Sequence, residues 1–311
     1  MDYGTPTPDY PEPVETPRHP WHEETTQYRV KLQCYSSVPP EVTIQRISYE
    51  RDFDAYHRAW EKGHHSCHPR RRTRDPERPQ DPESVERSRR RAQSRVRKLV
   101  QELAPDHFVT FTAREKGPKY FTPEQWASMW ARTVRLVRAA GGEIEYVAVL
   151  ERHPSNPEHL HLHVAWRGRV RYSLLHRFWR MAICEEMGVT FTPAMLKGEA
   201  SPGTFRDEPV KAPRGSFKAV RKIARYIAKY LTKDTIAEYN KKRYWPSKGI
   251  ELEGARVYYL HALTHSAAIR EALQLVGQWD YERDAPAQAL FMPSERVVWF
   301  AVDPDRTPPP F

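Results

Sequence analysis

The sequence predicts an α+β fold, with a central antiparallel sheet flanked by helices and a basic extension on its N-terminal side. Two observations support this prediction. Between residues 106 and 276, short apolar segments of strand length alternate with longer segments of helical periodicity. A polar loop with Pro154 and Pro157 separates two adjacent strand-like segments, which is typical of a hairpin with a long turn. We expect the helices to cover one face of this sheet.

The elements of this fold follow one another in a regular order. A strand over residues 107–112 (HFVTFT) precedes a helix that begins at the capping box Thr122-Pro123-Glu124-Gln125 and ends at Gly141. The apolar segment 145–150 (EYVAVL) and the alternating segment 159–164 predict a pair of strands. The remaining expectations are a helix over 173–187, a short strand over 189–192, a loop over 198–215, a helix over 216–233, a strand over 255–260 and a helix over 266–276.

Composition divides the chain into a main domain and flanking segments. Residues 1–27 are rich in proline, threonine and acidic residues, which predicts a disordered tail. Residues 28–80 predict an accessory segment, with a strand-like run over 28–35 and a helix-like run over 53–60, followed by an arginine- and proline-rich linker. The main domain is expected over 81–262, and a C-terminal helix with a proline-rich tail over 263–311.

Length and apolar content indicate a globular protein. The chain has 311 residues, of which 39% are hydrophobic, so it can bury a large core. There is no apolar run of membrane-spanning length and no N-terminal signal peptide, which predicts a soluble protein of the cytoplasm. The three cysteines form no disulfide framework, in agreement with a reducing compartment.

The charge balance predicts a polyanionic partner. The formal net charge is +10, and 12% of the residues are aromatic, so nucleic acid is the leading candidate. A helix beginning at Asp81-Pro82-Glu83 carries a run of basic residues that suits contact with phosphates, although a solvated charged face is the alternative. Trp166, Trp179 and Trp245 are candidates for base stacking, or else core residues.

Alternating histidines are the most informative local pattern. In the segment Glu158–Val164 (EHLHLHV), strand geometry places His159, His161 and His163 on one face and the leucines between them on the other. Glu151 ends the preceding strand and can reach the same site. Two imidazoles and one carboxylate can bind Mg²⁺, Mn²⁺ or Zn²⁺ and leave positions open for water and a phosphate oxygen. The alternative is a set of surface histidines on the polar face of an amphipathic strand.

The helix expected over 216–233 carries a repeated pair of residue types. Tyr226 and Tyr230 lie one turn apart, and Lys229 and Lys233 follow at the same interval. A phenol is a poor nucleophile at its ordinary pKa near 10, but a nearby ammonium and a polarised phosphate would assist it. The alternative is an amphipathic helix whose tyrosines are packing residues.

The motifs HFVTFT, VLE before HLHLHV, and ARYIAKYLTKD, in this order, resemble the three motifs of HUH endonucleases, specifically the rolling-circle replication initiators of small phages and plasmids. The resemblance spans roughly residues 88–260. It implies an HUH/RRM-like palm, with His161 and His163 as the paired metal ligands and Glu151 as the acidic ligand. It also implies that Tyr230, followed by Tyr226, provides the nucleophiles of the YxxxY form.

The resemblance further implies an activity and its partners. The enzyme would use Mg²⁺ or Mn²⁺ to nick and rejoin single-stranded DNA at a replication origin through a covalent 5′-phosphotyrosine, with Lys233 and Lys229 neutralising developing negative charge. It would work in the bacterial host cytoplasm. The sequence contains no GxxxxGK(S/T) motif, so a host helicase would unwind the DNA, and a host polymerase would extend it.

Two other functions remain open at this point. A tyrosine transposase of an insertion sequence shares the same chemistry, and its relatives commonly add a cysteine-rich zinc module. Here His64, His65, Cys67 and His68 are close enough in sequence to bind a metal, but there is no matching second pair. A non-catalytic, basic nucleic-acid-binding protein is the second alternative.

Overall fold

The computed structural model describes two compact units. The described residues are 26–47, 82–114, 120–153, 156–196, 198–208, 216–233, 244–275, 279–280, 285–286, 289–292 and 297–302. One unit comprises residues 1–35, 39–78 and 253–311, and the other comprises 36–38 and 79–252. The expected helix over 53–60 and the candidate zinc residues 64–68 lie outside the described residues.

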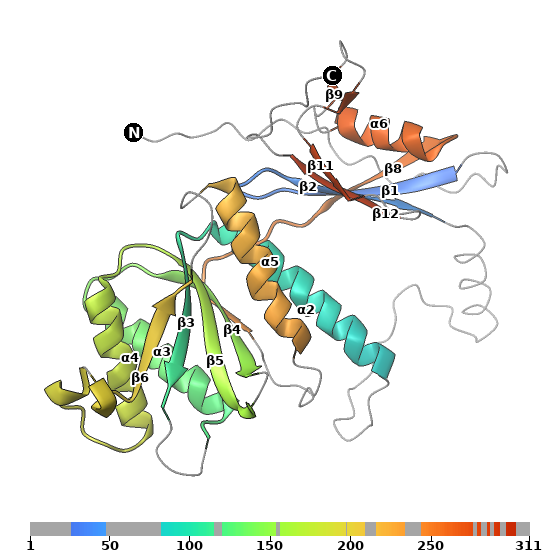
Figure 1. Cartoon of the computed structure of the whole chain (residues 1–311). Helices are drawn as coiled ribbons and strands as arrows, with labels where there is room; N and C mark the ends of the chain where they lie inside the picture. Colours follow the sequence, from blue (N-terminus) through green and yellow to red (C-terminus); the bar gives the residue numbers. More distant parts are fainter. Residues whose placement is uncertain are drawn as a thin grey trace, which may run out of the picture. The chain divides into compact units, whose positions relative to one another are not determined.

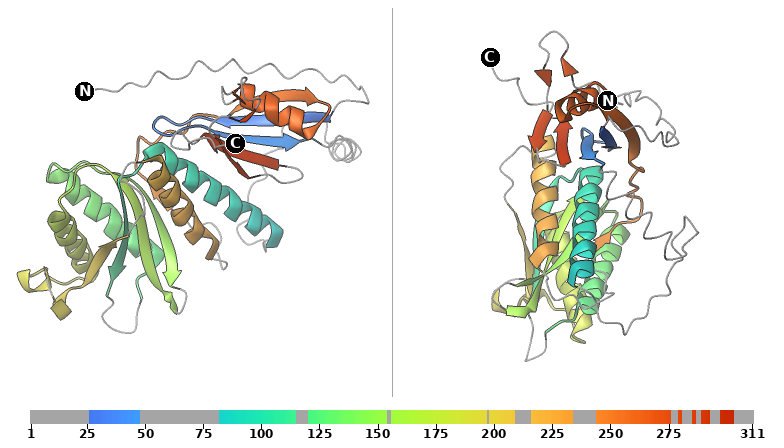
Figure 2. Two further views of the ribbon diagram at one scale, coloured as in Figure 1. Left: turned by 45° about the horizontal axis from the view of Figure 1, so that its top comes forward. Right: turned by 90° about the vertical axis from the view of Figure 1, so that its right-hand side faces the viewer.

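The first unit contains an antiparallel sheet and one helix. The sheet order is β11-β12-β2-β1-β8, with β1 at Thr26–Gln33, β2 at Glu41–Arg46, β8 at Arg256–Ala262, β11 at Ala289–Met292 and β12 at Val297–Val302. Helix α6 (His265–Leu275) packs on it, and its Ala268 and Ala272 contribute to a core with Val30 and Tyr258 (Figure 2). Two short strands, β9 (Trp279–Asp280) and β10 (Ala285–Pro286), pair with each other.

The strand expected over 28–35 corresponds to β1, but its pairing was not expected. β1 pairs along its length with β8, with Val30 opposite Tyr258. The sequence grouped this later strand with the main domain, whereas the fold places it in the first unit. Alternation within β1 buries Tyr28, Val30 and Leu32 on one face, as expected for a half-buried antiparallel strand.

The second unit contains the central sheet, which confirms the α+β class. Its order is β6-β3-β5-β4-β7, and every adjacent pair is antiparallel. The strands are β3 (His107–Ala113), β4 (Glu145–His153), β5 (Asn156–Arg167), β6 (Gly203–Asp207) and β7 (Tyr244–Pro246). The helices are α2 (Pro82–Leu103), α3 (Pro123–Ala139), α4 (Tyr172–Glu186) and α5 (Phe217–Lys233), with short 3₁₀ turns at Pro193–Leu196 and Gly198–Ala200.

Helices cover both faces of this sheet, so the expectation of one covered face was wrong. Figure 1 shows α3 and α4 on one face and α2 with α5 on the other. Leu162 and Val164 of β5 pack on the α3/α4 side, whereas Ala165 of β5 and Val149 of β4 pack on the α2/α5 side. The near-continuous apolar run of β4 is the physical reason, because a strand buried on both faces needs apolar residues at consecutive positions.

The ends of α3 and α4 show how the sequence sets element boundaries. The Thr122 side chain accepts a hydrogen bond from the Gln125 amide, and the Gln125 side chain accepts one from the Thr122 amide, which confirms the capping box. Helix α4 closes at Gly188, whose φ of +67° suits glycine. The strand expected over 189–192 does not form, and the chain enters a 3₁₀ turn at Pro193 instead. No helix in the described ranges is long and apolar enough to cross a membrane.

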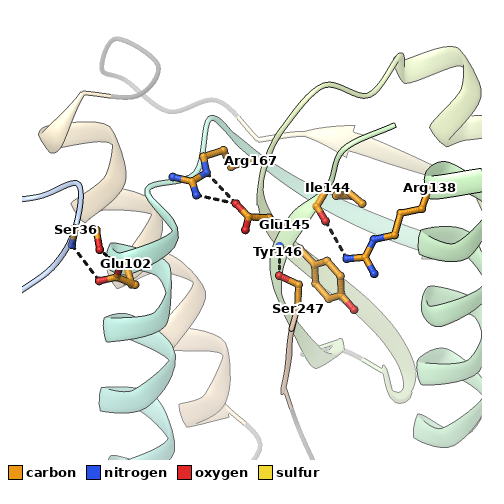
Figure 3. Close-up of polar contacts among 8 residues, drawn as sticks. All are labelled: Ser36, Glu102, Arg138, Ile144, Glu145, Tyr146, Arg167 and Ser247. Carbon is orange, nitrogen blue, oxygen red and sulfur yellow. Dashed lines mark hydrogen bonds and ion pairs between the residues drawn. The ribbon is translucent and has the colours of Figure 1, made fainter. Parts of the chain in front are cut away.

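Polar contacts stabilise the position of β4 between its neighbours (Figure 3). Arg167 of β5 donates to the carboxylate of Glu145, its partner across the strand pair, at 2.7 and 3.2 Å. On the other side, the Tyr146 amide donates to the Ser247 hydroxyl at 3.0 Å. The figure also shows Arg138 donating to the Ile144 carbonyl, and Ser36 donating to the Glu102 carboxylate.

Candidate active site

The expected metal ligands lie on one face of the central sheet. Glu151 of β4 is directly opposite His161 of β5, and Val149 is opposite His163. Because side chains two residues apart share a face, Glu151, His161 and His163 all point toward the side covered by α2 and α5. His159 shares this face, one pair of residues farther along the strand.

His163 and Glu151 form the buried centre of this site. The Glu151 Oε2 atom lies 2.7 Å from Nε2 of His163. Only 3% of His163 and 5% of Glu151 are exposed. Buried ionisable groups are stable only when they are paired, so this contact explains how two such side chains can lie beneath α5.

The third expected ligand, His161, is half-buried and part of a histidine group. Its ring centroid lies 4.9 Å from that of His159 and 5.2 Å from that of His153. Burial, followed by the neighbouring histidines, lowers the pKa of His161 to about 4, although the Glu151 carboxylate acts in the opposite direction. At neutral pH, His161 is therefore an uncharged imidazole with a nitrogen lone pair.

This depressed pKa makes stability depend on pH. The ordinary histidine pKa near 6.5 applies to the unfolded chain. Between about pH 6.5 and about pH 4 the unfolded chain therefore binds a proton that folded His161 does not, and the free energy of unfolding falls as the pH decreases through this window. We expect His161→Gln to reduce this loss.

Urea unfolding in EDTA at about pH 7 and about pH 4.5 measures the difference. Burial also lowers the pKa of His176, which gives a loss of the same sign in both proteins, so the informative quantity is wild type minus variant. An equal loss of stability in both proteins would contradict the assignment to His161.

Helix α5 positions the two tyrosines differently. Ser216 caps the helix by accepting a hydrogen bond from the Ala219 amide, and Ile223 and Ile227 bury the face that packs on the sheet. Tyr230 lies on this inner face and is 5% exposed, whereas Tyr226 is 45% exposed. The difference follows from the rotation of about 40° between positions four residues apart.

The ring of Tyr230 lies directly on the ring of His163. Their centroids are 3.7 Å apart and the planes differ by 2°. Tyr226 packs edge-on against Tyr230, with 5.1 Å between centroids, and against Phe108. Burial raises the pKa of the Tyr230 phenol above its ordinary value, and a hydrogen bond with Tyr226 and the nearby Glu151 carboxylate add to this. The phenol is thus fully protonated at neutral pH in this state.

The two lysines differ in what the structure describes. Lys229 is exposed, one helical turn from Tyr226 and adjacent in sequence to Tyr230. Lys233 is the last residue of α5, and its side chain lies outside the described residues.

The donor types match a divalent cation, although their present spacing is not that of a formed metal centre. Across the described residues, no three His, Cys, Asp or Glu side chains come close enough together to hold an ion. Glu151 and His163 nevertheless meet at one point, and neutral His161 faces Glu151 from the adjacent strand. One carboxylate and two imidazoles suit Mn²⁺, and Mg²⁺ when phosphate oxygens complete the shell.

Two side chains that the sequence did not identify complete the buried part of the site. The Thr110 hydroxyl lies 2.9 Å from Nδ1 of His163 and donates to Glu208 Oε1 at 2.7 Å. Thr110 alternates with apolar residues in HFVTFT, so its position on the histidine face could have been found from the strand period. Glu208 follows β6 and had no comparable signal, because its position depends on the pairing of β6 with β3.

The remaining predicted DNA contacts have mixed outcomes. Trp166 and Trp179 are 1% and 0% exposed in the core on the α3/α4 side, so their candidate role in base stacking was wrong. Trp245 is half-buried. On α2, Val96 and Val100 pack inward, and Arg91 and Arg95 are exposed. Phosphate contact by this helix stays a prediction.

Comparison with protein families matches the segment that contains this site. Residues 106–235, which include β3 through α5, match a family model described as Replication-associated protein, of the ORF2 type. The match supports the expected family of rolling-circle replication initiators and indicates a function in DNA replication. No curated protein and no solved structure matches the chain.

Proposed function

We propose that this protein is a rolling-circle replication initiator that nicks and rejoins single-stranded origin DNA through a covalent 5′-phosphotyrosine. The observation that carries the proposal is the contact of the Tyr230 ring with His163, whose other neighbour is the Glu151 carboxylate. A candidate nucleophile therefore lies next to two candidate metal ligands, in the segment that matches replication-associated proteins.

The residues have separate roles in this reaction. Glu151, His161 and His163 would hold Mg²⁺ or Mn²⁺, which supplies Lewis-acid polarisation of the scissile phosphate. The phenol oxygen of Tyr230 attacks phosphorus, the bond from phosphorus to O3′ breaks, and the 3′ oxygen leaves with a proton. The products are a 5′-phosphotyrosine and a free 3′-OH, which a host polymerase can extend.

Rejoining reverses the same bond changes. A later 3′-OH attacks the phosphotyrosine, and the phenol leaves, so no ATP is required. Tyr226 is exposed one turn before Tyr230 and is proposed as the second nucleophile of successive rounds. Lys229 and Lys233 are proposed to neutralise the phenolate or phosphorane oxygens.

Binding of the strand is assigned to the basic helix α2. Its exposed arginines would contact backbone phosphates, which makes affinity fall as salt rises. Unwinding is assigned to a host helicase, in the cytoplasm of a bacterial host.

A labelled single-stranded oligonucleotide that contains the origin tests the proposal. With Mn²⁺ we expect a cleaved 3′-OH fragment and a covalent protein–DNA adduct, and with EDTA neither product. Mass spectrometry of the digested adduct identifies the modified tyrosine. DNA binding without any Mn²⁺-dependent cleavage would instead support a non-catalytic binding protein, and cleavage specific to the ends of a mobile element would support a transposase.

A further inference from the structure

A hydrogen-bonded series behind His163 has no role in the reaction as proposed above. It joins the Glu208 carboxylate, the Thr110 hydroxyl and the Nδ1 atom of His163, with distances of 2.7 and 2.9 Å. We call this series the Thr110 relay. It approaches His163 from the side opposite Glu151, which contacts the Nε2 atom of the same ring.

Strand register builds the relay. Thr110 of β3 lies directly opposite His163 of β5, so the two side chains are neighbours on one face. On the other edge of β3, Thr110 lies opposite Arg206 of β6, and Glu208 returns to the same face two residues later. The Glu208 amide donates to the Phe108 carbonyl at 2.8 Å, which holds this residue beside β3.

The relay has a direction. A threonine hydroxyl has one proton, and here it donates that proton to the Glu208 carboxylate. The hydroxyl oxygen can then only accept from His163, so the ring proton must be on Nδ1. In a neutral imidazole, the lone pair is therefore on Nε2, which points toward Glu151.

This arrangement creates a site for a cation. A nitrogen lone pair and a carboxylate oxygen repel each other unless a positive species lies between them. The opposite tautomer would place a proton on Nε2 and donate it to Glu151, which would close the same position. Histidine ligands of metals commonly donate their second ring N–H to a neighbouring oxygen, which fixes the tautomer.

We propose that Thr110 and Glu208 are positioning residues that hold His163 in the Nδ1–H tautomer and so keep Nε2 open for a divalent cation. The part of this inference that concerns the cation rests on the proposed function, whereas the tautomer is independent of it. Thr110 acts through His163 and touches neither substrate nor cation.

The experiment measures Mn²⁺ binding and the His163 tautomer in the full-length protein. Mn²⁺ affinity is taken from electron paramagnetic resonance of free Mn²⁺. The tautomer is taken from ¹⁵N chemical shifts of the imidazole, with the His163 signal assigned by its loss in His163→Gln. We expect Thr110→Val to bind Mn²⁺ about 10- to 100-fold more weakly and to lose the Nδ1–H signature. Thr110→Ser keeps the hydroxyl and should restore both.

Two further variants separate the relay from general damage to the strand. Thr112→Val makes the same change two residues along the same face of β3, where the hydroxyl donates to the Thr204 carbonyl. It should leave Mn²⁺ affinity unchanged. Glu208→Gln should weaken binding less than Thr110→Val, and adding it to Thr110→Val should have no further effect, because Glu208 acts through Thr110.

The outcomes distinguish the relay from the proposed function. Wild-type affinity and an unchanged tautomer in Thr110→Val would overturn the inference, as would an Nε2–H tautomer in the wild type. If the wild type binds no Mn²⁺ but shows the Nδ1–H tautomer, which Thr110→Val loses, the relay stands and the proposed metal chemistry fails. If Thr110→Val does not fold, Thr110→Ser and Glu208→Gln decide by the same two measurements.

Discussion

Replacing Tyr230 by phenylalanine is expected to reduce formation of the covalent DNA adduct by about a thousandfold or more, since no other group at this position can form the phosphoester. The variant removes one oxygen atom and keeps the ring that stacks on His163 at 3.7 Å. Its fold and its Mn²⁺ affinity should therefore match those of the wild type. Loss of adduct with retained Mn²⁺ binding would assign the effect to the nucleophile.

Tyr226→Phe is the matched variant on the same helix. Its phenol is largely exposed and lies one turn from Tyr230, so we expect the first cleavage to continue at a rate within a few fold of the wild type. A second strand transfer from an adduct on Tyr230 should be lost, because it needs a free second phenol.

The measurement is single-turnover cleavage of a labelled oligonucleotide, followed by peptide mapping of the adduct. Loss of first cleavage in Tyr226→Phe, with normal cleavage in Tyr230→Phe, would reverse the assigned roles. Retained cleavage and adduct in the double variant would contradict a tyrosine nucleophile altogether.

Local patterns predicted most of the central sheet and its helices. The alternation of His161 and His163 with leucines placed the histidines on one face, because side-chain direction in a strand depends only on sequence spacing. The capping box at Thr122 and the glycine at position 188 marked helix ends, since caps depend on neighbouring residues.

Features that depend on distant pairing were not predicted. β8 has the apolar character of a strand, but nothing in its sequence indicates that it pairs with β1 and not with the central sheet. The strand expected over 189–192 has suitable residues and no strand pairing in the described fold, and unpaired strands do not persist. Glu208 joins the site only because β6 pairs with β3 in one register.

The tryptophans show a different reason for error. Trp166 and Trp179 were candidate stacking residues because the chain is basic and aromatic, which describes composition and not position. Trp166 has the parity of Leu162 and Val164 on β5, and the strand period already placed it on the face opposite the histidines. The positional pattern was the more reliable guide.

The second large effect is expected from Glu151→Gln, which should abolish stabilisation by metal without unfolding the protein. In the wild type, Mn²⁺ at about one hundred times its dissociation constant should raise the free energy of unfolding by about 2.7 kcal/mol, because the cation binds only the folded state. The glutamine amide is a weak metal ligand, so this increase should vanish in the variant, and DNA cleavage should fall by about a thousandfold.

The Thr110 relay predicts what the glutamine does in the absence of metal. With the ring proton on Nδ1, the Nε2 lone pair of His163 can accept a hydrogen bond from the new amide, at the position where the carboxylate now lies 2.7 Å away. Glu151→Gln should therefore unfold in EDTA at a temperature equal to or above that of the wild type. Glu151→Ala leaves the same nitrogen buried without this donor and should cost about 1–3 kcal/mol.

Thermal unfolding with EDTA and with Mn²⁺ measures both effects, and His159→Gln provides the control. His159 lies on the same face of β5, beyond the proposed ligands, so its replacement should leave the Mn²⁺-dependent increase intact. An undiminished increase in Glu151→Gln would exclude Glu151 as a ligand. An Mn²⁺ effect lost equally in His159→Gln would move the cation toward the group formed by His153, His159 and His161, because these rings already lie within 4.9 to 6.0 Å of one another.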